Sequence, residues 1–307
     1  METNVFGGSI VALVTPFDRK GRVDRRTIKR LVEYHIKNGT SAILPCGTTG
    51  ESSTLSHDEH DKVIEIVVHV SAGRIKVIAG TGSNSTVETI RLTKHAQMVG
   101  VDGVLLVCPY YNKPTQEGVF LHYKAVSEST DAPIIIYSIQ GRTGINIDPE
   151  TVARIADLSN VVGIKEASGN LDQMSRIIAL VGKKIALFSG DDALTLPVLA
   201  IGGVGVISVL ANIMPREVGD MVKEFVAGNI VGARSIHYLT LPLVKALFLE
   251  TNPVPIKTAM GLMGMINPDV RLPLCEMEPY NIAKLQSVLI KLGLMSQRHR
   301  ALIKRNG

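Results

Sequence analysis

The sequence of 307 residues has little cysteine, no long apolar run and no leader-like segment. Its three cysteines, Cys46, Cys108 and Cys275, lie far apart without metal-ligand spacing. Two fall inside apolar runs, which predicts small buried hydrophobes in a reducing compartment. No stretch approaches the roughly 18 apolar residues of a membrane helix, and no basic segment precedes a long apolar one as in a signal peptide. We therefore expect a cytoplasmic protein with no membrane partner.

Neither sign of charge dominates, since 33 Lys and Arg face 28 Asp and Glu for a formal net charge of +5. Part of the excess lies in a C-terminal tail that carries Arg298, Arg300, Lys304 and Arg305. Such a tail is compatible with a nucleic-acid or membrane contact. A solvated, frayed terminus is the interpretation that we favour, so we expect no nucleic-acid partner.

Short apolar runs alternate with amphipathic segments of helical length over the first two-thirds of the chain. The runs are rich in Val and Ile, as buried strands are. Strand alternating with helix eight times predicts parallel strands with helical crossovers, and eight units fit a closed (β/α)8 TIM barrel. The expected strands are Gly8–Val14, Ala42–Cys46, Lys76–Gly80, Gly103–Cys108, Ile134–Ser138, Val161–Lys165, Ile185–Ser189 and Gly205–Val209.

The intervening segments place apolar residues on one helical face, and Ser56 with Glu59 predicts a capping box. After about Asn229 the pattern changes, and no further strand is evident. We predict a catalytic barrel over residues 1–229 and a C-terminal helical appendage over residues 230–307. The expected helices are Asp24–Lys37, His57–Ser71, Thr86–Val99, Glu117–Ser129, Asp148–Ala156, Leu171–Val181, Asp192–Ile201, Pro215–Val226, Gly232–Leu249, Pro255–Met265 and Tyr280–Leu294.

An open, doubly wound sheet is the alternative to the barrel. Such a sheet usually carries a glycine fingerprint for a dinucleotide after its first strand. Here the first strand runs into Thr15-Pro16-Phe17-Asp18, which contains no glycine. The cluster Gly202-Gly203-Val204-Gly205 precedes a strand rather than a helix, so it is not that fingerprint either.

Lys165 is the most informative residue, because it ends the apolar run Val161–Lys165. In a barrel the active site lies at the carboxyl ends of the strands. Desolvation there lowers the pKa of a lysine from about 10.4 toward neutrality. The neutral amine is a nucleophile that can form a Schiff base with a carbonyl substrate. The alternative interpretation is a lysine at the end of a strand that points into solvent.

Other strand ends carry groups that suit the same chemistry. Gly47–Gly50 offers backbone N–H groups and two hydroxyls to a carboxylate, although a tight turn would use the same glycines. Tyr137 and Tyr111 are phenols that can pass protons, and ordinary packing is their alternative. Arg142 lies between glycines and can present a fork to a second carboxylate, unless it is a plain surface residue.

Metal-binding patterns are weak in this sequence. Asp191 and Asp192 could hold a metal as a pair, but no histidine or third carboxylate accompanies them in sequence. Capping of the next helix is the interpretation that we favour. His57 and His60 lie one turn apart without the His-Glu-x-x-His pattern, so we reject zinc and expect no metal.

Four motifs together resemble the 4-hydroxy-tetrahydrodipicolinate synthase family, formerly the dihydrodipicolinate synthases, of the pyruvate-dependent class I aldolase superfamily. The resemblance runs from Gly8-Ser9-Ile10 to Pro253-Val254-Pro255-Ile256-Lys257. It implies a lyase that condenses pyruvate with L-aspartate 4-semialdehyde in diaminopimelate and lysine biosynthesis. The motifs are Gly47-Thr48-Thr49-Gly50-Glu51, Pro109-Tyr110-Tyr111-Asn112, Ile164-Lys165-Glu166-Ala167-Ser168-Gly169 and Ser189-Gly190-Asp191-Asp192.

The resemblance also implies catalytic roles. Lys165 forms the imine with pyruvate, and it needs no cofactor because the imine is itself the electron sink. Tyr137, Thr48 and Tyr111 form a proton relay, in which Tyr111 reaches into the site of a neighbouring subunit. This crossing fits a homotetramer built as a dimer of tight dimers.

Substrate-binding roles follow from the same resemblance. Thr48 and Thr49 hold the carboxylate of pyruvate, and Arg142 binds that of aspartate semialdehyde. The main-chain carbonyls of Gly190 and Ile207 contact the bound pyruvate. One departure concerns this set: the segment after Tyr137 is Ser138-Ile139-Gln140, where the family usually has Asn-Val-Pro with its stiffening proline.

Some members of the family are inhibited by lysine at a site between subunits, and the matching polar set is present here. We therefore predict inhibition by L-lysine. The same residues have an alternative interpretation as a packed, polar subunit contact. The set consists of Ser52, Ser53, His57, His60, Asn84, Glu88 and Tyr110.

Two rival functions remain open at this point. N-acetylneuraminate lyases and 2-keto-3-deoxy-sugar-acid aldolases share the lysine and the first tyrosine, but tend to lack an arginine at the position of Arg142. Thr49 and Arg142 therefore favour the synthase. The rival from another class is a catalytically idle binding protein that senses pyruvate or lysine. Nothing in the sequence requires it, since Lys165, Tyr137, Tyr111 and Thr48 are all present.

Overall fold

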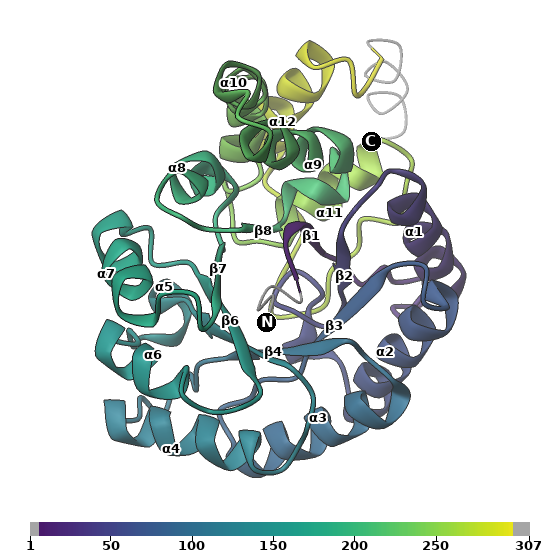
Figure 1. Cartoon of the computed structure of the whole chain (residues 1–307). Coiled ribbons are helices and arrows are strands. Elements are labelled where there is room, and N and C mark those ends of the chain that lie inside the picture. The colour runs from purple at the N-terminus through teal and green to yellow at the C-terminus, as the bar shows by residue number, and fades with distance from the viewer. Residues whose placement is uncertain (1–5, 297–307) are drawn as a thin grey trace.

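The computed structural model describes residues 6–296, and within them eight parallel strands close into a barrel in chain order (Figure 1). The predicted (β/α)8 fold is confirmed, with strand limits that agree with the sequence prediction to within two residues. The strands are β1 (Gly8–Ala12), β2 (Ala42–Leu44), β3 (Lys76–Gly80), β4 (Gly103–Val107), β5 (Ile134–Ser138), β6 (Val161–Glu166), β7 (Ala186–Ser189) and β8 (Gly205–Ser208).

The strands divide the core into two layers, because successive side chains point to opposite faces of a sheet. The inner layer fills the barrel and includes Ile10, Leu44, Ile135, Phe188 and Ile207. The outer layer lies between the strands and the surrounding helices. A filled interior makes the barrel a packed core rather than a pore, so chemistry is confined to its rim.

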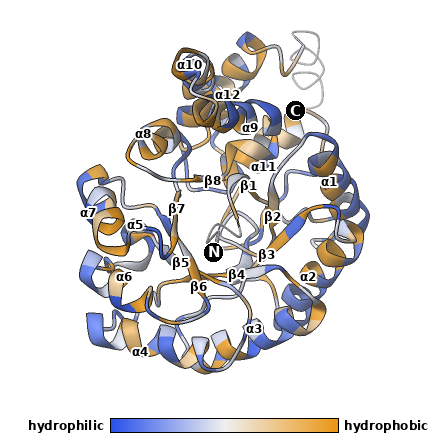
Figure 2. Ribbon diagram, viewed as in Figure 1, coloured by the Kyte–Doolittle hydropathy of each residue, from blue (hydrophilic) through white to orange (hydrophobic). Residues whose placement is uncertain are grey.

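The helices around the barrel turn apolar faces toward the strands and polar faces outward (Figure 2). Asp24 caps the first of them, and Ser56 with Glu59 forms the predicted capping box at the second. These helices are α1 (Arg25–Lys37), α2 (His57–Ser71), α3 (Thr86–Val99), α4 (Gln116–Ser127), α6 (Pro149–Ile155), α7 (Leu171–Val181), α8 (Thr195–Ala200) and α9 (Pro215–Val226).

Short helical turns at the rim differ from the sequence predictions. The segment around Arg142, predicted as a loop, is the short helix α5 (Gln140–Thr143). The helix predicted over Asp192–Ile201 is divided into η2 (Asp192–Leu194) and α8. Two further 3₁₀ turns, η1 (Ser52–Thr54) and η3 (Leu210–Asn212), follow β2 and β8. Turns this short carry too little periodic signal to be detected in a sequence.

Three further helices follow the barrel, as predicted: α10 (Ile230–Ala246), α11 (Val254–Leu262) and α12 (Pro279–Lys291). They pack together beside α9 (Figure 1). Their residues Leu243, Ile256 and Leu285 belong to the same apolar cluster as the outer layer of the barrel. Residues 230–296 are therefore packed into the barrel core rather than attached by a linker.

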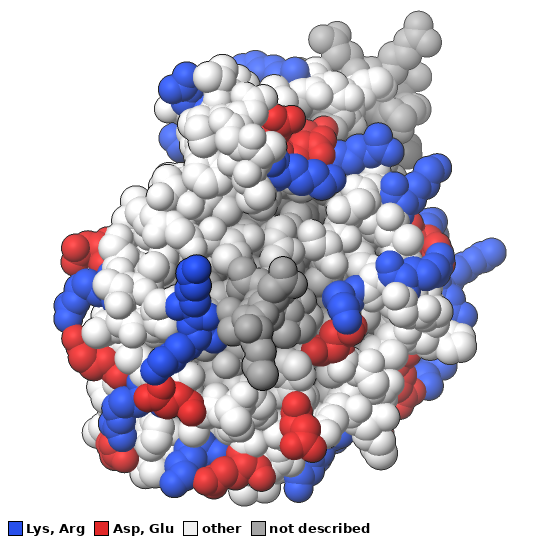
Figure 3. All heavy atoms as spheres, in the orientation of Figure 1, with Lys and Arg blue, Asp and Glu red and all other residues white. Residues whose placement is uncertain are grey.

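Charged side chains of both signs are intermingled on the face of the molecule shown in Figure 3. The basic tail residues Arg298, Arg300, Lys304 and Arg305 lie outside the described residues. Among residues 6–296, no helix is both long and apolar enough to span a membrane.

Candidate active site

Lys165 is buried at the carboxyl end of β6, with 7% of its surface exposed. It is the register partner of Tyr137 on β5 and of Phe188 on β7. Its Nζ lies 4.2 Å from the centre of the Tyr137 ring. Within residues 6–296 no hydrogen bond or ion pair to another side chain engages this amine. The predicted burial is confirmed.

A second buried lysine shows the opposite arrangement. Lys257, on α11, is 0% exposed, and its Nζ lies 2.6 Å from Glu51 Oε1. The same Nζ donates to the backbone oxygen of Thr15 over 3.0 Å. Burial lowers the pKa of Lys257, while the Glu51 carboxylate opposes that shift. This ammonium is held by partners, so within residues 6–296 Lys165 is the one buried lysine whose amine has no hydrogen-bond or ion-pair partner.

Gly190 brings its backbone against the Lys165 side chain. A Cβ atom on Gly190 would lie 3.2 Å from Lys165 Cε and 2.6 Å from the Cβ of Ala167. The Gly190 N–H donates to the Glu166 carbonyl over 2.7 Å, which fixes this approach. Ile207 is 1% exposed in the inner layer of the barrel. Gly190 thus lies against Lys165, whereas Ile207 lies on β8 in the inner layer of the barrel.

The loop after β2 carries Thr48 and Thr49. Thr48 lines a small cavity of about 30 Å³ together with Tyr137, Gly47 and Val107. Thr49 is 2% exposed, and its Oγ1 accepts a hydrogen bond from Asn252 Nδ2 over 3.0 Å. Because the hydroxyl accepts there, its proton is available to another acceptor. The structure therefore brings Thr48 and Tyr137 together at one cavity, whereas Thr49 does not line that cavity and is held by Asn252.

Arg142 lies exposed on α5, at the rim next to β5. Its Nη2 donates to the backbone oxygen of Asn252 over 2.9 Å. Asn252 thus contacts both Thr49 and Arg142, although it lies 203 residues after Thr49 in the chain. Sequence reasoning missed Asn252, and its only signal was its place directly before the Pro253–Lys257 motif.

An open cavity of about 270 Å³ lies beside this group of residues, between the barrel rim and α10. Gly190 and Ala167 form part of its barrel side, and Val244 and Phe248 face them. Lys165 itself does not line this cavity, but its neighbours in the chain and in space, Ala167 and Gly190, do.

Tyr111 stands apart from the other predicted catalytic residues within one chain. It is 89% exposed, and its φ of 73° is a left-handed conformation that costs a non-glycine residue free energy. It does not line the cavity of Thr48 and Tyr137. The described chain alone therefore assembles Lys165, Tyr137 and Thr48, but not Tyr111.

Comparison with known proteins identifies the family of this chain. Residues 5–292 match the model of the dihydrodipicolinate synthetase family. The chain belongs to this family. The 4-hydroxy-tetrahydrodipicolinate synthase of Syntrophus aciditrophicus (strain SB) is 56% identical over 291 residues, which cover 95% of this chain and all of that protein.

Solved structures of the dihydrodipicolinate synthetase family share the fold. Dihydrodipicolinate synthase from Aquifex aeolicus superposes with a TM-score of 0.93 at 52% identity, over 94% of this chain and 99% of that chain. The DHDPS of Cyanidioschyzon merolae with lysine bound has a TM-score of 0.92 at 43% identity, over 94% of this chain and 99% of that one.

A polar cavity of about 220 Å³ lies next to the small cavity that Thr48 and Tyr137 line. The two cavities share Ser52 and Gly82. On one wall, His57 Nε2 lies within hydrogen-bond distance of Glu88 Oε1, at 2.5 Å. Asn84 does not line this cavity, and its backbone oxygen accepts from Asn112 Nδ2. Of the residues that resemblance to the dihydrodipicolinate synthetase family assigned to lysine binding, the cavity wall includes Ser52, Ser53, His57, His60, Glu88 and Tyr110.

The paired aspartates after β7 have different roles. Asp191 accepts a hydrogen bond from Ala193 N and caps η2, as predicted. The prediction was wrong for Asp192, which is buried and accepts from Ser208 Oγ and the N–H groups of Val209 and Leu210. Burial raises the pKa of Asp192. Its carboxylate joins the end of β7 to that of β8, because it points inward rather than along its own turn.

Among residues 6–296, no group of three or more His, Cys, Asp and Glu side chains is arranged to hold a metal ion. His60, one half of the weak histidine pair, instead has its Nε2 2.9 Å from the Gly80 carbonyl oxygen. Cys46 and Cys108 are buried and unpaired, as the sequence predicted, and Cys275 is exposed.

Proposed function

We infer that the protein is a lyase of the class I aldolase type, with the activity of its family. It condenses pyruvate with L-aspartate 4-semialdehyde to give 4-hydroxy-tetrahydrodipicolinate, the first committed step of diaminopimelate and lysine biosynthesis. Membership of the family supports this function. The observation that carries the chemistry is the buried, unpaired amine of Lys165 beside Tyr137.

The proposed reaction begins when Lys165 Nζ attacks the keto carbon of pyruvate and water leaves, which gives an imine. Loss of a methyl proton gives the enamine, and the positive imine nitrogen takes up the electrons. The enamine carbon then attacks the aldehyde and forms the new carbon–carbon bond. Finally the amino group of the second substrate displaces Lys165 from the imine, which closes the ring and restores the amine.

The other residues move protons and hold carboxylates in this proposal. Tyr137, Thr48 and Tyr111 relay protons to and from the imine nitrogen and the new hydroxyl. Thr48 and Thr49 bind the pyruvate carboxylate, with the carbonyls of Gly190 and Ile207 beside the bound pyruvate. The close approach of Gly190 to Lys165 Cε supports this placement.

Arg142 is the proposed anchor for the carboxylate of aspartate semialdehyde. Its guanidinium can offer two parallel N–H donors to a carboxylate. The bond to the Asn252 backbone supports a fixed direction for this side chain despite the missing proline at residues 138–140. Sugar-acid aldolases and N-acetylneuraminate lyases are disfavoured, because their aldehyde partner has no amino-acid carboxylate.

We propose a homotetramer in which Tyr111 completes the relay of a neighbouring subunit. The support is the 89% exposure of the Tyr111 side chain together with its left-handed backbone conformation. Within residues 6–296 of one chain, neither the exposed ring nor the strained backbone is offset by a stabilising contact of the ring. We further propose a cytoplasmic location, and a division at residue 229 into a catalytic barrel and a helical region.

L-lysine is the proposed inhibitor, and the polar cavity next to Thr48 is its proposed site. An amino-acid ligand needs both acceptors and donors, which the Glu88 carboxylate and the hydroxyls of Ser52, Ser53 and Tyr110 offer. The related DHDPS of Cyanidioschyzon merolae, solved with lysine bound, supports the ligand class.

The decisive experiment is reduction with borohydride in the presence of pyruvate, followed by mass spectrometry of the peptides. We expect a three-carbon adduct on Lys165 and none in a Lys165→Ala variant. Addition of aspartate semialdehyde or a sugar aldehyde then distinguishes the synthase from the sugar-acid aldolases. An adduct on another residue would exclude the proposed mechanism, and an adduct without turnover would favour the idle pyruvate sensor.

A further inference from the structure

The loop that carries Thr48 and Thr49 lies between two residues of unfavourable backbone conformation. Cys46 has a φ of 56° and Glu51 a φ of 52°, both in the left-handed region. Such a conformation costs a non-glycine residue free energy and persists only where its surroundings hold it. The contacts that hold Glu51 therefore decide the shape of the loop.

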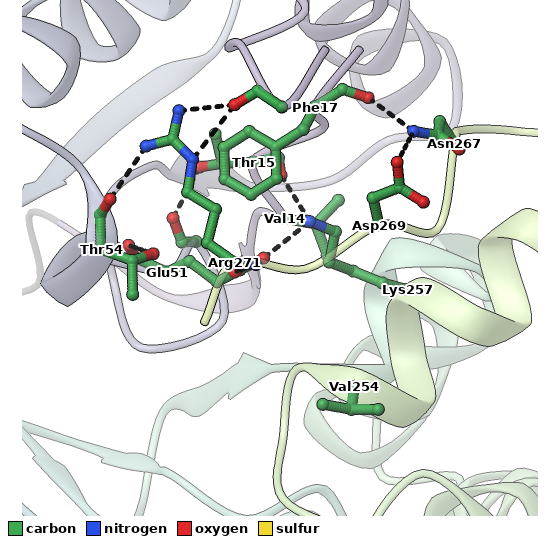
Figure 4. Close-up of polar contacts among 12 residues, drawn as sticks. Val14, Thr15, Phe17, Glu51, Thr54, Val254, Lys257, Asn267, Asp269 and Arg271 are labelled. Atoms are coloured by element: carbon green, nitrogen blue, oxygen red, sulfur yellow. Dashed lines mark hydrogen bonds and ion pairs between the residues drawn. The ribbon is translucent and has the colours of Figure 1, made fainter. Parts of the chain in front are cut away.

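Glu51 is held by the C-terminal helical region. Its Oε1 accepts from Lys257 Nζ over 2.6 Å, and its Oε2 accepts from the Arg271 backbone N–H over 3.0 Å (Figure 4). The side chains of Lys257 and Glu51 are 0% and 1% exposed. Both carboxylate oxygens thus have a donor, and water reaches neither partner of the pair.

Lys257 also contacts the loop indirectly, through Thr15. Its Nζ donates to the Thr15 carbonyl over 3.0 Å, and Thr15 Oγ1 donates to the Gly50 carbonyl over 2.7 Å. Gly50 directly precedes Glu51, so one ammonium group stabilises the loop by two routes. The ring of Phe17 packs against this ammonium group, with Lys257 Nζ 4.2 Å from the ring centre.

Arg271 extends the same network to the segment after the loop. Its guanidinium donates to the Thr54 carbonyl over 2.9 Å and to both carboxylate oxygens of Glu59. Its Cζ lies 4.3 Å from the centre of the Phe17 ring. Figure 4 shows Arg271 and Lys257 on either side of this ring. The network thus holds the chain from Glu51 to the start of α2.

Stability alone does not explain a buried ion pair at this place. Desolvation of two charges offsets most of their attraction, and an apolar pair of similar volume is often equally stable. An apolar pair, however, has no directional hydrogen bonds with which to fix the backbone of Glu51 or the Thr15 carbonyl. The pair therefore contributes geometry that packing would not supply.

We propose that Glu51 and Lys257 are positioning residues that set Thr48 and Thr49 in the orientation that binds the carboxylate of pyruvate. This inference rests on the proposed function of the site. It places the control of pyruvate binding in α11, which lies outside the barrel, whereas the residues that contact pyruvate lie inside it.

The test compares Lys257→Met, Glu51→Gln and the double variant Glu51→Gln/Lys257→Met with the wild type. Lys184→Met is the matched control, because it removes an exposed pair with Asp157. The measurements are Tm, the KM values for pyruvate and for aspartate semialdehyde, and the pyruvate concentration that gives half-maximal borohydride trapping on Lys165.

We expect Lys257→Met to have a lower Tm, because it leaves the Glu51 carboxylate buried and unpaired. The double variant removes both charges and should recover much of that Tm. Its KM for pyruvate and its half-maximal trapping concentration should stay raised by about ten-fold or more. The KM for the aldehyde should change much less, and the control should match the wild type throughout.

Recovery of the pyruvate KM together with Tm in the double variant would show that the pair only stabilises the fold, and would overturn the proposal. A normal pyruvate KM in folded Glu51→Gln or Lys257→Met would do the same. Trapping of the wild type on Lys165 checks the proposed function separately. Failure there would refute the chemistry, whereas failure in the variants alone would refute only the positioning role.

Discussion

Lys165 Nζ lies 4.2 Å from the centre of the Tyr137 ring, and the two residues are register partners on adjacent strands. The hydrogen-bonded ladder between β5 and β6 fixes this relationship, because register partners on adjacent strands point their side chains to the same face of the sheet. The amine and the phenol are thus oriented before a substrate arrives, which lowers the entropic cost of reaction.

The Tyr137→Phe variant should lose about 10²- to 10⁴-fold in kcat, as expected for loss of a general acid–base group. Its Tm should stay close to that of the wild type, because no hydrogen bond to another group in residues 6–296 engages the hydroxyl. Steady-state rates and thermal unfolding check this. An active Tyr137→Phe enzyme would remove Tyr137 from the relay.

Gly190→Ala should slow imine formation and also lower Tm. The new Cβ would lie 2.6 Å from Ala167 Cβ and 3.0 Å from the Glu166 carbonyl oxygen, so the backbone beside Lys165 must shift, and Lys165 Cε at 3.2 Å must give way slightly. Gly219→Ala is the matched control, because its Cβ would meet only the Gly39 carbonyl oxygen at 4.0 Å. Equal rates of borohydride trapping in both variants would contradict the proposed place of Gly190 beside Lys165 and bound pyruvate.

Arg142→Ala should raise the KM for aspartate semialdehyde by about ten-fold or more while the KM for pyruvate changes little. The reason is that, in the proposed reaction, the carboxylate of aspartate semialdehyde binds beside α5, whereas the carboxylate of pyruvate binds Thr48 and Thr49. Arg142→Lys should recover part of the loss, since it keeps the charge without the bidentate fork. A parallel rise of both KM values would assign Arg142 to structure instead.

Lysine at millimolar concentration should inhibit the enzyme, and Glu88→Gln should weaken that inhibition without changing the uninhibited rate. Glu88 lines the polar cavity, and its hydrogen bonds to Ser83 and His57 lower the pKa of its carboxyl. It therefore offers a charged acceptor to an ammonium group. Rate measurements at several lysine concentrations check this, and an uninhibited wild-type enzyme would refute the predicted site.

Stability should fall as the pH decreases from about 6.5. Burial lowers the pKa of His35 to about 3 and that of His122 to about 4. Between these values and about 6.5 the unfolded chain binds protons that the folded chain does not, so each histidine costs about 1.4 kcal/mol per pH unit.

His35→Gln should reduce this dependence on pH, measured as the difference in unfolding free energy between pH 7 and pH 5. The exposed His69→Gln variant is the control. Buried carboxylates such as Glu166, whose pKa is raised by burial, act in the opposite direction. The difference between variants, rather than the wild-type curve, therefore isolates the histidine contribution. Identical curves for His35→Gln and the wild type would contradict it.

Local periodicity determined most of the fold. The spacing of apolar residues located every strand, and helices such as α2, α3, α7 and α9 begin and end at the predicted residues. Lys165 was found for the same reason, because the end of a buried strand in a barrel is a defined place. Short elements such as α5 were missed, because four residues carry no measurable period.

The tertiary structure alone decided which of these residues meet. Glu51 and Lys257 lie 206 residues apart, and no local pattern predicts that they form a buried pair. Asn252, which links Thr49 to Arg142, and Asp192, which joins β7 to β8, depend equally on distant partners. The sequence by itself determined the elements and the place of Lys165 at the end of a buried strand, because both follow from neighbours along the chain. Closure of the barrel and the packing of α11 against it decided which lysine is paired and which is free.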